Sequence, residues 1–167
     1  TPSLIYVDRK RHVQVGAVAA ETYLEAEMGR FVRWRRKEAG DLEVTVASLE
    51  HDPIEFVQTV NVLVDDAANG RLLQSIKTAL FNERYEGTQI FDKFYPVDEL
   101  IRLILTYLRK AAEAQLGKKV DRIMLGRPVR FSQNPLADSR AEAILMRAAF
   151  LAGFKDVRFE LEPVGIA

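Results

Sequence analysis

The last third of the chain most constrains the fold, because it alternates strand, loop, helix and strand. Residues 120–125 alternate apolar and polar side chains, which is typical of a half-buried strand, and Gly126-Arg127-Pro128 follows them. A helix is expected next, and it ends at Gly153, where a left-handed cap fits. The apolar residues of this helix recur at helical spacing: Ala141, Ile144, Leu145, Ala148, Ala149 and Ala152. Residues 157–161 are again extended and run into Glu162. Such a βαβ unit places a carboxylate at the carboxyl end of a strand, where α/β sheets usually bind ligands.

The most regular element is a long amphipathic helix over residues 96–116. Pro96 suits the first helical position, and Asp98 and Glu99 oppose the positive end of the helix dipole. Gly117 follows as a C-terminal stop. The apolar stripe consists of Val97, Leu100, Ile101, Ile104, Leu108, Ala111 and Ala112. Together with the βαβ unit, this helix predicts an α/β fold.

The composition indicates a folded chain and excludes several functions. Of the 167 residues, 48% are hydrophobic and 29% are charged, which suits one domain or two small subdomains and argues against disorder. The chain has no cysteine and only two histidines, so neither disulfides nor a zinc site are expected. The lack of cysteine also suits a reducing compartment, and we expect the protein in the cytoplasm. The formal net charge of zero argues against electrostatic binding to nucleic acid or to a membrane.

Shorter elements are expected before the long helix. They are strands at 4–6, 12–15 and 42–48, helices at 16–27 and 72–81, a strand or short helix at 56–64, and loops at 29–41 and from residue 82 up to Tyr95. We expect residues 1–95 to form a smaller peripheral subdomain. We expect residues 96–167 to form part of a core subdomain, in the order helix, strand, helix, strand.

The order of these pieces resembles the ATPase domain of the seventy-kilodalton heat-shock (DnaK-type) chaperones. In that family a strand ends in a proline, a helix that closes with Ala-Gly follows, and the next strand runs into Glu-Pro and small residues, as residues 162–167 do here. Residues 1–5 resemble the family's Pro-Ser strand, and residues 15–19 resemble its Val-Gly-x-x-Ala helix start. Residues 112–120 resemble the end of its long helix.

Two further segments refine this resemblance. Ser75-Ile76-Lys77 resembles the family's lysine-bearing segment. The amino-acid sequence of this segment, like that of residues 152–157, is closest to the divergent YegD-type relatives. Met28 to Gly70 matches the family only loosely.

The resemblance implies one lobe of a two-lobed ATPase with an actin-like, ribonuclease-H-like fold. The chain begins with Thr1 rather than methionine, so we expect a fragment of a longer protein. The family's first hairpin, with a Gly-rich phosphate turn, would precede Thr1, and the second lobe, with the adenosine pocket, would follow Ala167. The longer protein is expected to hydrolyse ATP with Mg²⁺ and to meet a client or co-chaperone protein. No Gly-rich phosphate loop occurs in these residues, so the fragment alone is expected to be inactive.

The same resemblance implies roles for three residues. Lys77 matches the lysine that lies over the γ-phosphate and orients the attacking water; the alternative is an ordinary lysine on the solvated side of a short helix. Glu162 matches the glutamate that faces the metal through water, and the alternative is a strand-end glutamate in solvent. Pro128 matches the proline that couples the nucleotide state to the next helix, and the alternative is a simple strand terminator. Lys77 and Glu162 are therefore expected to face one cleft.

The sequence departs from the chaperones around Pro128. Arg127 stands where they have an apolar residue, and the loop from Phe131 to Asp138 is longer than theirs. The arginine that they carry early in the next helix falls near Glu142. These differences argue against chaperone-style signalling to a substrate domain.

Three other clusters are weaker. Residues 33–37 place Trp34 among cations, as a nucleic-acid patch would, but zero net charge favours a solvated loop anchored by Trp34. His51-Asp52 is interpreted as a turn rather than a catalytic base. Asp65-Asp66 is interpreted as a helix start rather than a metal pair.

Two alternative functions are left open by the sequence. One is another actin-fold phosphotransferase, such as a sugar kinase. The other is a non-catalytic interaction module, a relic of an ATPase that binds partners through Met28 to Gly70.

Overall fold

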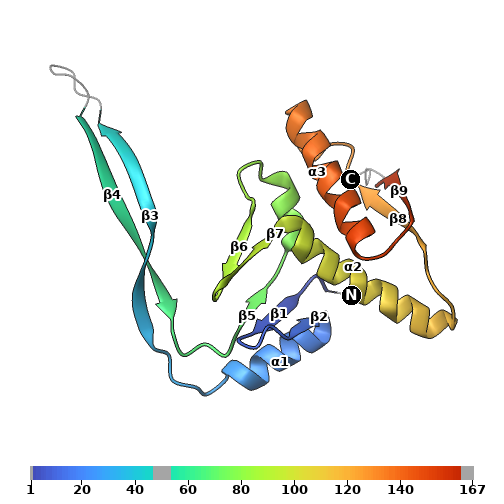
Figure 1. Ribbon diagram of the computed structural model, residues 1–167, viewed down its shortest axis with the longest axis horizontal. Coiled ribbons are helices and arrows are strands. Elements are labelled where there is room, and N and C mark those ends of the chain that lie inside the picture. Colours follow the sequence, from blue (N-terminus) through green and yellow to red (C-terminus); the bar gives the residue numbers. More distant parts are fainter. Residues whose placement is uncertain (1, 47–53, 163–167) are drawn as a thin grey trace, which may run out of the picture. The chain divides into compact units, whose positions relative to one another are not determined.

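The computed structural model describes residues 2–46 and 54–162, with backbone alone for residues 42–46 and 54–56. Its contacts divide the chain into two units, drawn in Figure 1. The core unit comprises Thr1–Ala26 and Gly70–Ala167, and the hairpin arm comprises Glu27–Asn69. The boundary predicted between residues 95 and 96 lies within the core unit, and the division into peripheral and core subdomains there stays a prediction.

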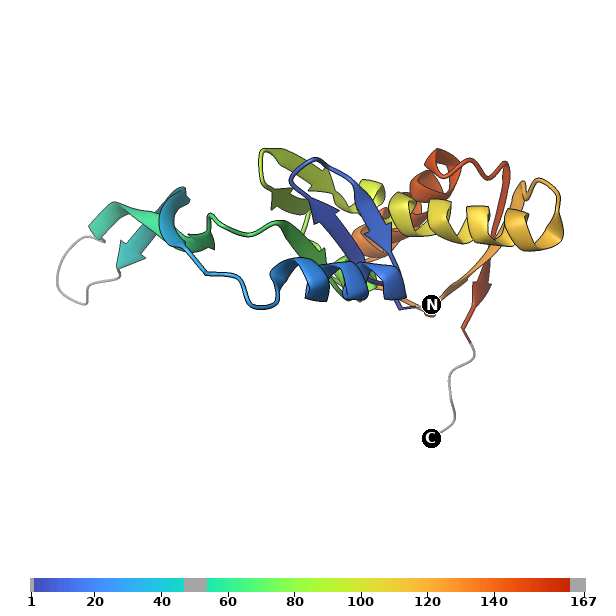
Figure 2. The ribbon, with the colours of Figure 1, turned by 90° about the horizontal axis from the view of Figure 1, so that it is seen from below.

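The core unit begins with a three-stranded antiparallel sheet and one helix. Strand β1 (Ile5–Asp8) lies between β2 (Val13–Val15) and β5 (Gly70–Leu73), and helix α1 (Ala17–Glu27) follows β2, as Figure 2 shows. The first two strands and the helix confirm the sequence prediction. A Cβ atom at Gly70 would overlap the outer part of the Tyr6 ring, so glycine at residue 70 leaves room for that ring beside β5.

The segment between β5 and the long helix differs from the prediction. The helix expected at 72–81 is wrong in its first part, because residues 70–73 pair with β1 as a strand. Ser75 then adopts a left-handed φ of 57°, and only a 3₁₀ helix, η1 (Ile76–Phe81), follows. The loop expected before Tyr95 contains a hairpin of β6 (Gly87–Ile90) and β7 (Lys93–Pro96).

The long helix α2 (Val97–Leu116) lies at the centre of the core unit. It buries Val97, Leu100, Ile101 and Leu105, which pack in one cluster with residues of β1 and of the second long helix. Pro96 is the N-cap rather than the first helical residue. Gly117 caps the C-terminus at a φ of 65°, and its N–H donates to the Glu113 carbonyl at 2.9 Å. The predicted helix and its glycine cap are confirmed.

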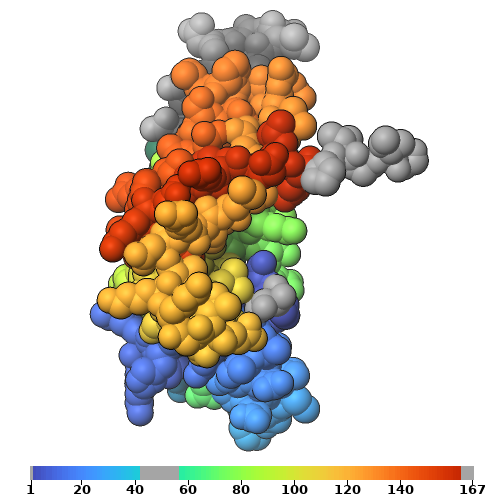
Figure 3. All heavy atoms as spheres, turned by 90° about the vertical axis from the view of Figure 1, so that its right-hand side faces the viewer, coloured from blue at the N-terminus to red at the C-terminus, as the bar shows by residue number. Residues whose placement is uncertain are grey.

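The predicted βαβ unit is also confirmed. Strands β8 (Arg122–Arg127) and β9 (Asp156–Leu161) pair in parallel, and α3 (Pro135–Leu151) connects them. Asn134 caps α3 by accepting the Leu136 N–H at 3.0 Å. Gly153 follows the helix in a left-handed conformation, with φ at 94°. Figure 3 shows the surface of this side of the core unit, with residues of β9 in red beside the amber end of α2.

The hairpin arm consists of two long antiparallel strands, β3 (Trp34–Val46) and β4 (Ile54–Asp65), with an irregular register between Glu38 and Gly40. The loop predicted at 29–41 is therefore wrong from Trp34 onward. Trp34 is 65% exposed and anchors no loop. His51-Asp52 lies outside the described residues.

Strand β4 ends at Asp65 and Asp66 follows in a turn, so the predicted helix start there is wrong. Asp65 accepts the N–H groups of Arg33 and Ala67, both at 3.0 Å, and pairs with the Arg30 guanidinium. Arg30 also pairs with Glu27, and these three side chains, all largely buried, join the two ends of the arm. The hydrogen bond from Arg30 lowers the pKa of Asp65 to about 2. Across residues 2–46 and 54–162, no helix is both long and apolar enough to cross a membrane.

Candidate functional site

The candidate site lies at the carboxyl ends of β8 and β9. The backbone N–H of Glu162 donates to the Arg127 carbonyl at 2.7 Å, which extends the parallel pairing by one step. The Glu162 side chain lies against Gly126, since a Cβ atom built there would be 3.3 Å from the Glu162 Cγ. The backbone therefore fixes where Glu162 leaves the sheet, and the missing side chain at Gly126 leaves room for it.

The two faces of the β8–β9 pair differ. Side chains alternate along a strand, so Ile123, Leu125 and Arg127 share one face, and Ile123 and Leu125 pack on the core. Met124 and Gly126 belong to the opposite face, where Met124 is 63% exposed. Glu162 lies over Gly126 and so belongs to this open face, where the residue is exposed.

Arg127 lies on the same face as Ile123 and Leu125, and it attaches this face to helix α3. Its side chain is 13% exposed and pairs with Glu142 and with Asp138, the latter at 3.2 Å from the guanidinium to Oδ2. The guanidinium also donates to the Pro128 carbonyl at 3.2 Å and lies 5.3 Å from the Phe131 ring centre. A planar guanidinium offers several donors in fixed directions, so one residue can tie the strand end, the loop and the helix together.

Asp138 completes this network from the helix side. It accepts the Phe131 N–H at 2.6 Å, and this hydrogen bond, together with the Arg127 guanidinium, lowers the pKa of the Asp138 carboxyl. The loop after β8 is therefore fastened to the first turns of α3 by charge-assisted bonds.

The sequence identified Arg127 and Glu142 only as departures from the chaperones, and it missed that they pair. The sequence contained a signal for this pair. Relative to the chaperones, position 127 gains an arginine, whereas position 142 has a glutamate where they have an arginine. Pro128 follows the last residue of β8 and is partly buried, as a strand terminator would be. Its predicted coupling role stays a prediction.

Lys77 is the second residue of η1 and is exposed. The 3₁₀ helix packs against α2 and α3 through other residues, including the buried Ile76. No contact between Lys77 and Glu162 occurs in the described part of the chain, and their sharing of one cleft stays a prediction.

The described residues hold no group of three or more His, Asp or Glu side chains that could cage a metal ion. One exposed carboxylate at a strand end fits an ion that keeps most of its water, as Mg²⁺ does. A shallow hollow of about 270 Å³ lies elsewhere, between the start of α2 and α3, and its lining includes neither Lys77 nor Glu162.

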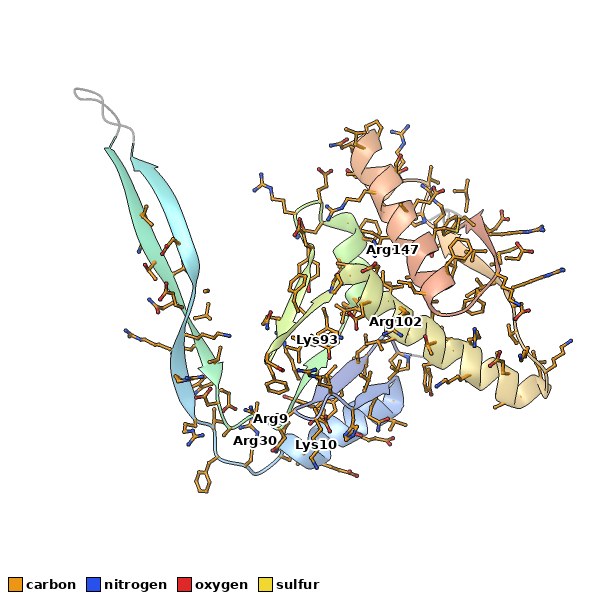
Figure 4. All side chains as sticks on the ribbon, viewed as in Figure 1. Arg9, Lys10, Arg30, Lys93, Arg102 and Arg147 are labelled. Carbon is orange, nitrogen blue, oxygen red and sulfur yellow. The ribbon has the colours of Figure 1, made fainter. Side chains whose placement is uncertain are left out.

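Ion pairs surround the start of α2, where Figure 4 labels Lys93, Arg102 and Arg147. Arg147 of α3 pairs with Asp98 at 2.9 Å, and Lys93 of β7 pairs with Glu99 at 2.6 Å. The two acidic residues that were predicted to favour the helix N-terminus thus also join α2 to its neighbours.

Comparison with known proteins gives distant relatives. No family model matches the chain. It is 30% identical over 110 residues to the chaperone protein DnaK from each of two strains of Ureaplasma parvum serovar 3. The matched part is 64% of this chain but 17% of each relative. The chain is therefore similar to a short part of a heat-shock chaperone, in agreement with the resemblance of its motifs.

Proposed function

We propose that this chain is part of the first lobe of a heat-shock-type ATPase, of actin-like fold, and that the longer protein binds and hydrolyses ATP with Mg²⁺. The observation that carries the proposal is the position of Glu162, at the carboxyl ends of a parallel strand pair and beside a glycine. Ligands of α/β sheets bind at such strand ends. The similarity to DnaK supports the same assignment.

Two residues of this chain, Glu162 and Lys77, suit the binding of a magnesium nucleotide. Mg²⁺ bound to ATP supplies charge neutralisation of the phosphates, and it prefers to keep several waters. Glu162 would accept hydrogen bonds from those waters. Lys77 would place a compact positive charge at the γ-phosphate and orient the attacking water, because phosphoryl transfer depends on positioned charge. A partner such as a client or co-chaperone belongs to the longer protein in this proposal.

Other parts of the longer protein must supply the phosphate-binding loops. Binding of a triphosphate needs several backbone N–H groups that converge on the anion, and the sequence has no Gly-rich loop of a known type. Lys77 and Glu162 alone offer one positive and one negative charge. We therefore expect the 167-residue chain to bind ATP no more tightly than about millimolar, or about −4 kcal/mol.

Two measurements test the proposal. Titration calorimetry should detect saturable Mg-ATP binding to a longer protein with both lobes, and no saturable heat at micromolar concentrations with the 167-residue chain. In the longer protein, Lys77→Ala should reduce ATP turnover by roughly 10²–10³ and leave binding nearly intact. Lys118→Ala, at another exposed lysine, is the matched control. A Lys77→Ala variant with parental turnover would show that Lys77 is an ordinary surface lysine.

The exposed apolar residues of the hairpin arm favour the interaction module as a second candidate. A longer protein that binds no nucleotide would select this candidate over the ATPase. The sugar-kinase alternative would be recognised by sugar-dependent consumption of ATP.

A further inference from the structure

The hairpin arm exposes apolar side chains on both of its faces. On one face of β4, Val60 and Val62 are 39% and 41% exposed, and on the other face Val57 and Leu63 are 62% and 64% exposed. No third strand pairs with β3 or β4 within the described ranges. A two-stranded hairpin is at best marginally stable in water, and a third strand or a packing partner is normally needed.

The two outer edges of this ribbon carry very different residues. Strand β3 has Arg35, Arg36, Lys37, Glu38 and Asp41 along its length, and it has an irregular register beside Gly40. Charged side chains and bulges are the features by which natural sheets prevent a further strand from pairing. Strand β4 has no charged residue, glycine or proline from residue 56 to residue 64. Its outer edge is a long row of backbone donors and acceptors without such protection.

We propose that two copies of this chain associate through the outer edges of β4, which pair antiparallel to form a four-stranded sheet. Each copy brings the same uncharged stretch, so no like charges meet within residues 56–64. The protected β3 edges then lie on the outside of the sheet, and the assembly stops at two copies. A foreign strand is the competing occupant, and a monomeric chain is the result that would favour it.

The charges along the ribbon select the antiparallel direction. The half at the base of the ribbon carries three cations and two acids on its two strands: Arg35, Arg36, Lys37, Glu38 and Asp65. The distal half carries three acids and no cation in its described strands: Asp41, Glu43 and Glu55. An antiparallel pair places the basic half of one ribbon beside the acidic half of its partner, whereas a parallel pair would place like charges together.

One cross-strand pair provides a matched test. Asn61 of β4 is directly opposite Glu38 of β3, so a lysine at either position changes one edge and leaves the other edge unchanged. Asn61→Lys puts a charge on the β4 edge and gains an opposite charge across the strand pair, so the ribbon itself stays formed. Glu38→Lys puts the lysine on the β3 edge, which is already charged.

The experiment is sedimentation of the 167-residue chain from about 1 to 100 μM, a range that covers affinities of about −8 to −5 kcal/mol. We expect a concentration-dependent dimer for the parent, at least about tenfold weaker association for Asn61→Lys, and parental association for Glu38→Lys. Circular dichroism and emission from Trp34, the single tryptophan, check that each variant folds. A parent that stays monomeric at 100 μM, an Asn61→Lys variant that associates like the parent, or a Glu38→Lys variant that dissociates equally would each overturn the proposal.

Discussion

The core unit and the hairpin arm are stabilised in different ways. The core unit buries a continuous apolar cluster that α2 shares with the β1 sheet and with α3. The arm is joined at its base by the ion pairs of Arg30 with Glu27 and Asp65, and its strands leave valine and leucine side chains in solvent. The comparison shows that apolar burial holds the core unit together, whereas ion pairs hold the base of the arm. The segment that the sequence analysis expected to match the family only loosely, Met28 to Gly70, nearly coincides with the arm.

The largest expected effect lies in the core unit. Leu100 of α2 is fully buried, and Leu100→Ala should lower the free energy of unfolding by about 2–5 kcal/mol, because it removes buried methyl groups and leaves a cavity. Val62→Ala in the arm, at a 41% exposed site, should change it by less than about 1 kcal/mol. Urea unfolding monitored by circular dichroism measures both. Equal losses at the two sites would contradict the distinction between the units.

A smaller effect is expected at the strand–helix loop of the core unit. Arg127→Met removes the cation that Asp138 and Glu142 share and should cost about 1–3 kcal/mol, since it leaves a largely buried network without its donor. Arg130→Met, at an exposed arginine in the same loop, is the control and should be nearly neutral. Thermal unfolding of the two variants measures the difference. Equal stability would mean that the ion pairs of Arg127 do not hold the loop.

The smallest effect concerns the base of the arm. Asp65 has a folded-state pKa of about 2, below the value of about 3.9 that is usual for an unfolded chain. Its contribution to stability is therefore fully present above about pH 4 and is lost as the pH falls toward 2. Trp34 lies opposite Asp65 in the strand register, so its fluorescence should report the loss in this range.

Asp65→Asn is the matched variant for this acid transition. Its Trp34 emission should already differ at pH 7 and should show a weaker change between pH 4 and pH 2. An acid transition identical to that of the parent would assign the effect to other carboxyl groups.

The elements that the sequence predicted are those with strong local periodicity. Helix 97–116 and the βαβ unit show complete apolar patterns and end at glycines, so local and tertiary preferences agree. The run Leu72, Leu73, Ile76 fits either a helix or a strand, and pairing with β1, distant in sequence, decided it. Residues 34–38 form a strand that is exposed on both faces, so no apolar alternation marks it.

The same limit applies to the candidate site. The position of Glu162 at a strand end could be predicted, because a carboxylate after a strand is a local signal, and its role stays a prediction. The sequence analysis noticed that Arg127 and Glu142 both depart from the chaperones, but it missed their pairing because the acidic partners of Arg127 lie 11 and 15 residues away, across a loop whose path the sequence does not specify.

The proposed role of Glu162, to serve a magnesium nucleotide, can be tested by Glu162→Gln in the longer protein. Glu160→Gln is the matched control, because Glu160 is also exposed near the end of β9, whereas the three atoms nearest to a Cβ built at Gly126 all belong to Glu162. We expect Glu162→Gln to lower ATP turnover at saturating Mg²⁺ by roughly 10²-fold and Glu160→Gln to keep the parental rate. Parental turnover in Glu162→Gln, or an equal loss in both variants, would show that Glu162 does not have this role.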